Sequence, residues 1–192
     1  MYKKLTKNKN DKYDEARKEV LVQAFPSYFG SFIKIAMNHN DVPDEPDTFN
    51  SSCFAYQVIA RIIRSIPDTA LTPAFEFAQN NVQTQQDELK EVSLILFSYI
   101  VFYNHNNELV TGLLQLFPEI LNENTSRVKD SALSLLQVII DYYFDDFKDQ
   151  IFSYSPILLE MLGKETDSPL VAAQICVTLS KYKKLPNFKD VV

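Results

Sequence analysis

The stretch "DSALSLLQVII" (130–140) carries the pattern that decides the fold, because three other segments repeat it. Apolar residues recur at helical spacing in all four segments. Four copies of one apolar helix predict a repeat architecture rather than one closed core. The other three copies are "CFAYQVIARII" (53–63), "EVSLILFSYIV" (91–101) and "VAAQICVTLSK" (171–181).

A small side chain opens the aligned face in each copy. Such a residue lets neighbouring helices approach closely, and larger residues four and seven positions later fill the contact. We therefore expect these helices to stack on one another. The aligned small residues are Ala55, Ser93, Ala132 and Ala172, at spacings of 38, 39 and 40 residues. The larger residues are Ile59, Phe97, Leu136 and Cys176, then Ile62, Ile100, Ile139 and Leu179.

A further apolar helix precedes each of the four copies, so the sequence predicts an all-α fold of about four antiparallel helix pairs. A unit of about 40 residues is typical of HEAT or armadillo repeats, and we expect a HEAT-type α-solenoid over 19–183. Its repeats would cover 19–66, 68–104, 107–144 and 147–183. Residues 1–18 form a charged segment whose order the sequence leaves open, and 184–192 a tail. The expected helices are 19–37, 51–66, 72–82, 85–103, 107–121, 125–144, 147–163 and 168–182.

Composition narrows the classes of function. The chain has 192 residues, of which 46% are hydrophobic, and only 3 glycines, too few for a protein built from tight β-hairpins. The formal net charge is −6. An acidic protein is a poor general binder of nucleic acid and a plausible partner for basic peptides. We therefore expect no nucleic-acid partner.

The cysteines and the apolar runs bear on the compartment. Cys53 and Cys176 lie far apart inside apolar helical patterns, which predicts two buried thiols in a reducing, intracellular environment. The longest apolar run covers 92–103, only twelve residues. A membrane span needs about 20, so we expect a buried helix there and no membrane insertion.

Charged residues also stand at the starts of two of the repeated helices. Lys90 and Glu91 precede Ser93, and Lys129 and Asp130 precede Ala132. In the HEAT pattern this position often carries a polar ladder between stacked repeats. Exposed ion pairs within each helix explain the same residues equally well.

The sequence offers no candidate for catalysis. His39 and His105 lie in Asn-rich turns, without neighbouring Cys, Asp or Glu at the spacing that metal ligands or catalytic groups require. Three glycines could hardly build a phosphate-binding loop. We expect no enzyme activity, no cofactor and no metal.

Acidic residues gather in two places. The turn "NDVPDEPDTFN" (40–50) carries Asp41, Asp44, Glu45 and Asp47 and is longer than the other turns within helix pairs. Long connections are often functional or flexible, so this one is either a solvated insertion or a surface for a basic partner. The second cluster is Asp141, Asp145, Asp146 and Asp149. We expect it in the turn between two repeats, where it is either a second acidic binding patch or a set of acids suited to the start of the next helix.

The order of these features resembles the middle HEAT repeats of the importin β family of nuclear transport receptors. The likeness covers roughly 20–183: an apolar helix, a long acidic loop, a helix that begins at "SSCFAYQV" (51–58), then regular repeats. It rests on that order and on no single motif.

The resemblance implies a protein-binding module. Its second helices would line a concave face that wraps basic segments of importin α or of cargo. Ran-GTP would contact the acidic loop at Asp41, Asp44, Glu45 and Asp47, nucleoporins would be further partners, and the chain would work in the cytoplasm and nucleus at the nuclear pore. The open alternatives are a HEAT scaffold subunit of a phosphatase, cohesin or trafficking complex, and an all-α enzyme domain.

Overall fold

The computed structural model describes residues 9–38, 51–122, 125–164 and 168–182. Over these ranges the chain is helical and contains no strand, which confirms the all-α prediction. It divides at Pro73 and Ala74, inside α3, into two compact units. The helices are α1 (Lys9–Met37), α2 (Ser51–Ser65), α3 (Pro67–Asn81), α4 (Asp87–Tyr103), α5 (Asn107–Leu121), α6 (Ser126–Phe152), α7 (Ser155–Lys164) and α8 (Pro169–Lys181).

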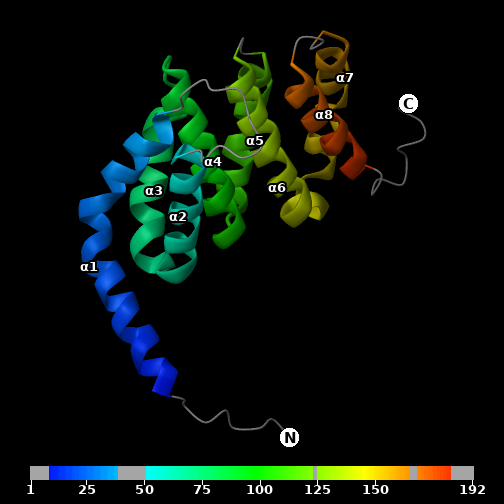
Figure 1. The fold of residues 1–192 in the computed structure, drawn as a ribbon. Coiled ribbons are helices and arrows are strands. Elements are labelled where there is room, and N and C mark those ends of the chain that lie inside the picture. Colours follow the sequence, from blue (N-terminus) through cyan, green and yellow to red (C-terminus); the bar gives the residue numbers. More distant parts are fainter. Residues whose placement is uncertain (1–8, 39–50, 123–124, 165–167, 183–192) are drawn as a thin grey trace, which may run out of the picture. The chain divides into compact units, whose positions relative to one another are not determined.

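In the first unit α1 packs on α2 (Figure 1). Phe25, Ile33 and Ala36 of α1 are buried, as is Ile59 of α2. The hydroxyl group of Tyr56 donates a hydrogen bond to the carbonyl oxygen of Ala36 at 3.3 Å. Only the second half of α1 gains this partner, since residues 14–20 are all exposed.

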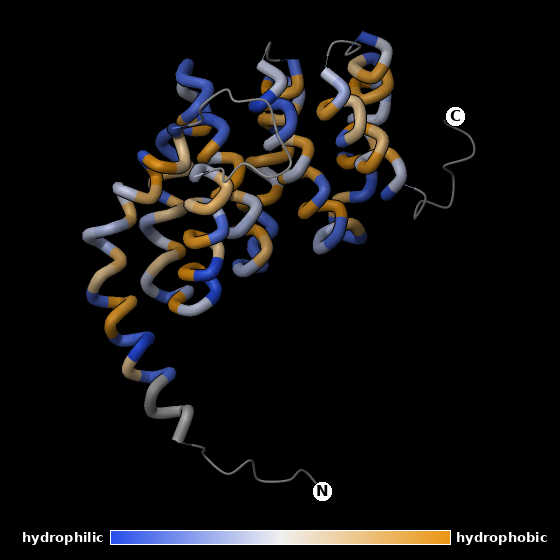
Figure 2. The backbone as a smooth tube through the Cα atoms, viewed as in Figure 1, coloured by the Kyte–Doolittle hydropathy of each residue, from blue (hydrophilic) through white to orange (hydrophobic). Residues whose placement is uncertain are grey.

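In the second unit α4, α6 and α8 form a row, in which α6 packs on both neighbours. α5 packs on α6, and α7 on α8. Successive helices alternate in direction, so the three helices of the row run the same way (Figure 1). Apolar positions recur along each of them (Figure 2), as burial of one face against a neighbour requires.

The predicted stacking face is buried in three of its four copies. Ser93 and Ala132 are fully buried, and the larger residues that follow them in α4 and α6 are at most 3% exposed. Ala55 and Ile59 of α2 are buried in the same way. The prediction was wrong by one residue in α8, whose buried residues are Val171, Ile175 and Thr178. A spacing of 39 therefore holds from α4 to α6 and from α6 to α8.

This one-residue shift also overturns the prediction of a buried thiol at Cys176, which is exposed beside the buried Ile175. Cys53 is exposed as well. It precedes Ala55 by two positions, and residues two apart on a helix point about 200° apart. An apolar segment thus predicted burial for side chains that lie on its outer face.

Three helices differ from those expected. α1 begins at Lys9 rather than at 19, so part of the charged segment 1–18 is helical. α3 begins at Pro67, directly after Ile66, so Pro73 lies inside the helix rather than at its start. α6 continues to Phe152 through a kink at Phe147, where φ is −124° and ψ is 16°. The expected helix 147–163 is therefore split between the last turns of α6 and α7. Apolar periodicity predicts where a helix lies, but it does not predict a kink at a single residue such as Phe147.

The apolar run 92–103 is a helix of the second unit with Leu94, Leu96 and Val101 buried, as predicted. A different segment is long and apolar enough to cross a membrane by length and composition. This is Asp14–Met37 of α1, of which 17% of the most apolar 18-residue window is buried.

Three buried tyrosines donate hydrogen bonds to backbone carbonyl oxygens of preceding helices or of the turns that follow them. The Tyr143 hydroxyl of α6 donates to the carbonyl oxygens of Val101 and Asn104, at 3.1 Å each, at the end of α4. Tyr154 and Tyr182 likewise donate to the carbonyl oxygens of Leu114 and Ile151. Burial raises the pKa of all three phenols. Val101 lies in the last turn of α4, where carbonyls lack partners inside the helix. The Leu114 carbonyl lacks one because the residue four positions later is Pro118, which has no N–H. A tyrosine hydroxyl supplies the missing donor in both places.

We expect Tyr143→Phe to lower the free energy of unfolding by about 1–2 kcal/mol, because it leaves buried carbonyl oxygens without a donor. Tyr142→Phe is the matched control, since that ring is exposed. Urea unfolding followed by circular dichroism measures both. Equal midpoints for the two variants would contradict the structural role of the Tyr143 hydroxyl.

The register of α8 gives a second prediction. Ile175→Ala should cost about 2–5 kcal/mol, as for other large-to-small changes in a core, whereas Cys176→Ala should change stability by less than about 0.5 kcal/mol. Thermal and urea unfolding distinguish the two. A larger loss at Cys176 would restore the sequence-predicted register.

Candidate protein-binding surface

The first candidate, the acidic loop at 40–50, lies outside the described residues. Asp41, Asp44, Glu45 and Asp47 therefore carry a sequence argument only. The structure describes the helix on each side, with α1 ending at Met37 and α2 beginning at Ser51.

The second acidic cluster lies on α6. Asp141, Asp145, Asp146 and Asp149 are all exposed. Asp141, Asp145 and Asp146 lie before the kink at Phe147 and Asp149 lies after it, where two helical stretches of α6 meet. The spacing of four residues places Asp141 and Asp145 along one strip of the helix, whereas Asp149 lies beyond the kink.

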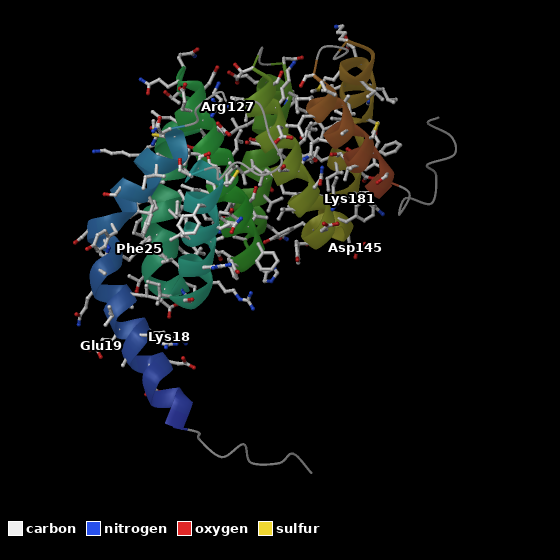
Figure 3. The ribbon with its side chains drawn as sticks, in the orientation of Figure 1. Lys18, Glu19, Phe25, Arg127, Asp145 and Lys181 are labelled. Atoms are coloured by element: carbon white, nitrogen blue, oxygen red, sulfur yellow. The ribbon has the colours of Figure 1, made fainter. Side chains whose placement is uncertain are left out.

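Two of these carboxylates contact neighbouring helices. Asp141 pairs with Lys181 of α8, and Asp146 accepts a hydrogen bond from the side-chain amide of Asn107 at 3.3 Å. Asp145 and Lys181 lie at the same end of α6 and α8 (Figure 3). The acidic strip thus runs beside the end of the helix row.

Exposed aromatic rings stand beside this strip. Phe102 of α4 and Tyr142 of α6 are 40% and 50% exposed. Their ring centroids lie 4.9 Å apart at an interplanar angle of 84°, an edge-to-face contact across two helices. Phe102 also contacts Tyr103, at 4.7 Å. We call Phe102, Tyr142, Asp141, Asp145, Asp146 and Asp149 together the aromatic–acidic patch.

The patch has the chemistry of a receptor for cations. Aromatic faces attract ammonium and guanidinium groups, and nearby carboxylates steer and pair with them. The sequence predicted the acids of this surface but not its rings, because the partner of Tyr142 lies 40 positions earlier in the chain. Only the repeat register brings the two helices together.

The predicted ladder residues lie between the helices of the row. Glu91 is buried, and its carboxylate pairs with the guanidinium group of Arg127 in α6 at 2.7 Å. Lys90 is buried too, whereas Lys129 and Asp130 are half-buried. Further polar contacts follow the same seam: Thr125 donates to Asp87, and the Gln137 amide to Gln174 and Thr178. Sequence reasoning missed Arg127, Gln137 and Gln174, since no pattern within one helix marks them.

Burial has the largest effect on the pKa values of Glu91 and Asp130, which lie in the polar seam, the line of polar contacts between α4, α6 and α8. It raises the pKa of Glu91, although the Arg127 charge and hydrogen bond oppose the shift. The negative charges of Asp130 and Glu88 add to the increase. Burial likewise raises the pKa of Asp130, against a hydrogen bond from Gln174. One Asp130 carboxylate oxygen, Oδ1, is buried without a hydrogen-bond partner. Ionisation of either acid therefore lowers the free energy of unfolding relative to its protonated form.

His105 is exposed in the turn before α5, as expected, and its ring lies 6.0 Å from that of Tyr143. His39 falls outside the described ranges. No cluster of three or more His, Cys, Asp or Glu side chains capable of holding a metal occurs in the part of the chain that the structure describes.

No family model matches the chain, and neither a curated protein nor a solved structure matches it.

The buried carboxylate gives a prediction for pH. Because the pKa of Asp130 is raised in the folded protein, folded Asp130 binds a proton more readily than unfolded Asp130. The free energy of unfolding therefore falls as pH rises from the ordinary pKa of an aspartate through the raised pKa of folded Asp130. Asp130→Asn should stabilise the protein at pH 7 by about 1 kcal/mol, the scale of a buried unsatisfied polar group. This gain should vanish below the ordinary pKa of an aspartate.

Urea unfolding of the wild type and the variant at several pH values, from about 3.5 to about 8, measures the difference in unfolding free energy, which should reach about 1 kcal/mol. Asp145→Asn is the control, because that carboxylate is exposed. A gain of the same size for both variants, or one that grows towards low pH, would contradict the assigned cause.

Proposed function

We propose that this chain is a non-enzymatic protein-binding module with a HEAT-type α-solenoid fold. The support is the regular stacking in the second unit. Cross-helix hydrogen bonds of Thr125, Arg127, Gln137, Tyr143 and Tyr154 join residues 36 to 42 positions apart. A near-constant offset is expected when equivalent helices of successive pairs pack in register. The Tyr182–Ile151 bond, at 31 positions, departs from it at the end of the row.

The partner that suits this surface is a basic segment of another protein. The single observation that carries the proposal is the aromatic–acidic patch, where exposed rings of two helices meet at a stretch of α6 that carries four exposed carboxylates. A Lys or Arg side chain would lie over a ring and pair with a carboxylate. The net charge of −6 favours encounter with such a segment.

The importin β resemblance makes the partner more specific. In that version the module binds basic segments of importin α or cargo, and Ran-GTP competes through the acidic loop at 40–50. Nucleoporins would be further partners, and the protein would shuttle through the nuclear pore. The order of apolar helix, acidic loop and regular repeats supports this version.

A scaffold subunit of a phosphatase, cohesin or trafficking complex is the second candidate. The observation that favours it is the absence of tryptophan from the chain. Importin β receptors use tryptophans on their inner helices to stack against basic ligands. A scaffold would use the same aromatic–acidic patch without any response to Ran.

Binding of a fluorescent Lys/Arg-rich peptide, followed by anisotropy, tests the basic-segment proposal. Asp145→Asn combined with Asp149→Asn should weaken binding about tenfold and flatten its salt dependence, because two favourable charges are lost. Phe102→Ser should weaken it by a similar factor through loss of a cation–π contact. Glu108→Gln with Glu119→Gln, two exposed acids of α5, is the control and should change little.

Two further arms separate the versions. Neutralising Asp41, Asp44, Glu45 and Asp47 tests the loop, which is a bystander if affinity and salt slope stay unchanged. Capture of Ran locked in its GTP form supports the transport version, and failure to capture it favours the scaffold. Peptide affinity that neither the patch nor the loop substitutions alter would refute the basic-segment proposal in both versions.

A further inference from the structure

α8, the last helix of the row, carries apolar residues on its exposed side as well as on its buried side (Figure 1). Val171 and Ile175 are buried, whereas Leu170 and Val177 are 56% and 46% exposed. At about 100° per residue, the exposed side chains of this helix cover an arc about 120° wide. We call these side chains the outer face of α8: Pro169, Leu170, Ala173, Cys176, Val177 and Ser180.

A face of this width and composition is typical of a helix side that packs on a neighbour. The apolar stripe of a surface helix is about 100° wide or more and faces the core, while charged and polar residues occupy the opposite side. α8 carries its only charged residue, Lys181, on the side of α6, where it pairs with Asp141. The outer face therefore lacks the charges that a helix side in contact with water normally carries.

The register of the row indicates which kind of element fits this face. Gln137 and Asp141 of α6 contact α8. The buried faces of α6 and α8 are offset by 39 residues, as for Ser131 and Leu135 against sites in α8 that include Ile175, and the same offset carries Gln137 and Asp141 onto Cys176 and Ser180. Both belong to the outer face. The outer face thus lies where a further helix of the row would pack.

The absence of charge from the outer face selects its partner. A basic peptide needs carboxylates and an anionic membrane needs basic side chains, and the six residues of this face offer neither. An uncharged face of small and apolar side chains is complementary to itself. Two copies of this chain, which has a net charge of −6, can meet there without placing carboxylates against each other. A second copy is therefore the occupant that this chemistry favours.

We propose that two copies of the chain pack through the outer faces of α8, as an antiparallel pair about a twofold axis. In such a contact residue i of one copy meets residue j of the other, and the reverse. The middle of α8 is Ile175, and a twofold axis there places Ala173 opposite Val177 of the second copy. A small residue opposite a larger one lets two helices approach closely. This inference does not rest on the proposed function, because it uses another surface.

Light scattering and sedimentation equilibrium of the full chain test the proposal. The wild type should pass from monomer to dimer between micromolar and millimolar concentration, because two short helices bury less than the roughly 800 Å² per partner of a standard interface. Val177→Glu should raise the dissociation constant at least about tenfold, since the twofold axis brings two unpaired carboxylates into the contact. Val20→Glu, the same change at an exposed valine of α1, is the control and should not alter it.

The two exposed cysteines report where the contact lies. Cys176 belongs to the outer face, and Cys53 lies on α2. Cys53→Ser and Cys176→Ser variants allow the reaction of one thiol at a time to be followed with an aromatic disulfide reagent. Cys176 should react more slowly in proportion to the dimeric fraction, whereas Cys53 should react at one rate throughout. Circular dichroism of each variant checks that the fold is retained.

Three results would overturn the proposal. The first is a wild type that stays monomeric at millimolar concentration, which would leave a different apolar partner for the outer face. The second is a dimer that survives Val177→Glu, or one in which Cys176 reacts as fast as in the monomer, since either would place the contact elsewhere. The third is loss of the dimer in Val20→Glu as well, which would assign the effect to added charge and not to α8.

Discussion

The close packing of α6 between α4 and α8 is the constraint on which the second unit depends. It is possible because small residues occupy the contact: Ser93 on α4 and Ala132 on α6 are fully buried. Larger residues one and two turns later, such as Phe97 and Leu136, then fill the space beside them. A bulky side chain at either small position would separate the helices and break the polar and aromatic contacts that cross between them.

The polar seam contributes little net stability but makes the packing specific. Glu91 and Asp130 are ionisable groups in a poorly solvated place, which costs free energy even where Arg127 or Gln174 offers partial compensation. A slip of α6 along α4 by one turn would separate Arg127 from Glu91 and leave the buried Glu91 carboxylate without this partner. Apolar surfaces alone would resist such a slip much less, because the hydrophobic effect is not directional.

The sequence predicts the helices better than their ends and better than their contacts. Apolar spacing located every helix of the described chain, because burial of one face leaves a periodic trace. It misplaced the face of α8 by one residue, since Ala172 and Cys176 are as small or apolar as their buried neighbours Val171 and Ile175. It also gave the start of α3 as Thr72–Pro73, because Pro67 and Pro73 are both compatible with a first turn.

In the candidate surfaces too, local sequence predicts individual residues but not their contacts across helices. The acids of α6 were visible in the sequence, whereas the Phe102–Tyr142 contact depends on a cross-helix register that composition does not encode. The Glu91–Arg127 pair was missed for a related reason. Local rules for charge pairs reach only three or four positions along a helix, and this pair spans 36.

The near-constant offset between bonded residues has a consequence for insertions and deletions. Removing one residue within α6 would rotate everything after it by about 100° around the helix axis, which would turn Ile139 and Tyr143 away from α4 together. A residue added in the turn before α5 would leave each helix face intact and only lengthen a connection. Removing about 39 residues between equivalent points of two stacked helices would join segments that already present the same face. Length changes in this fold are therefore tolerated in turns and in whole units, but not singly inside the stacked helices.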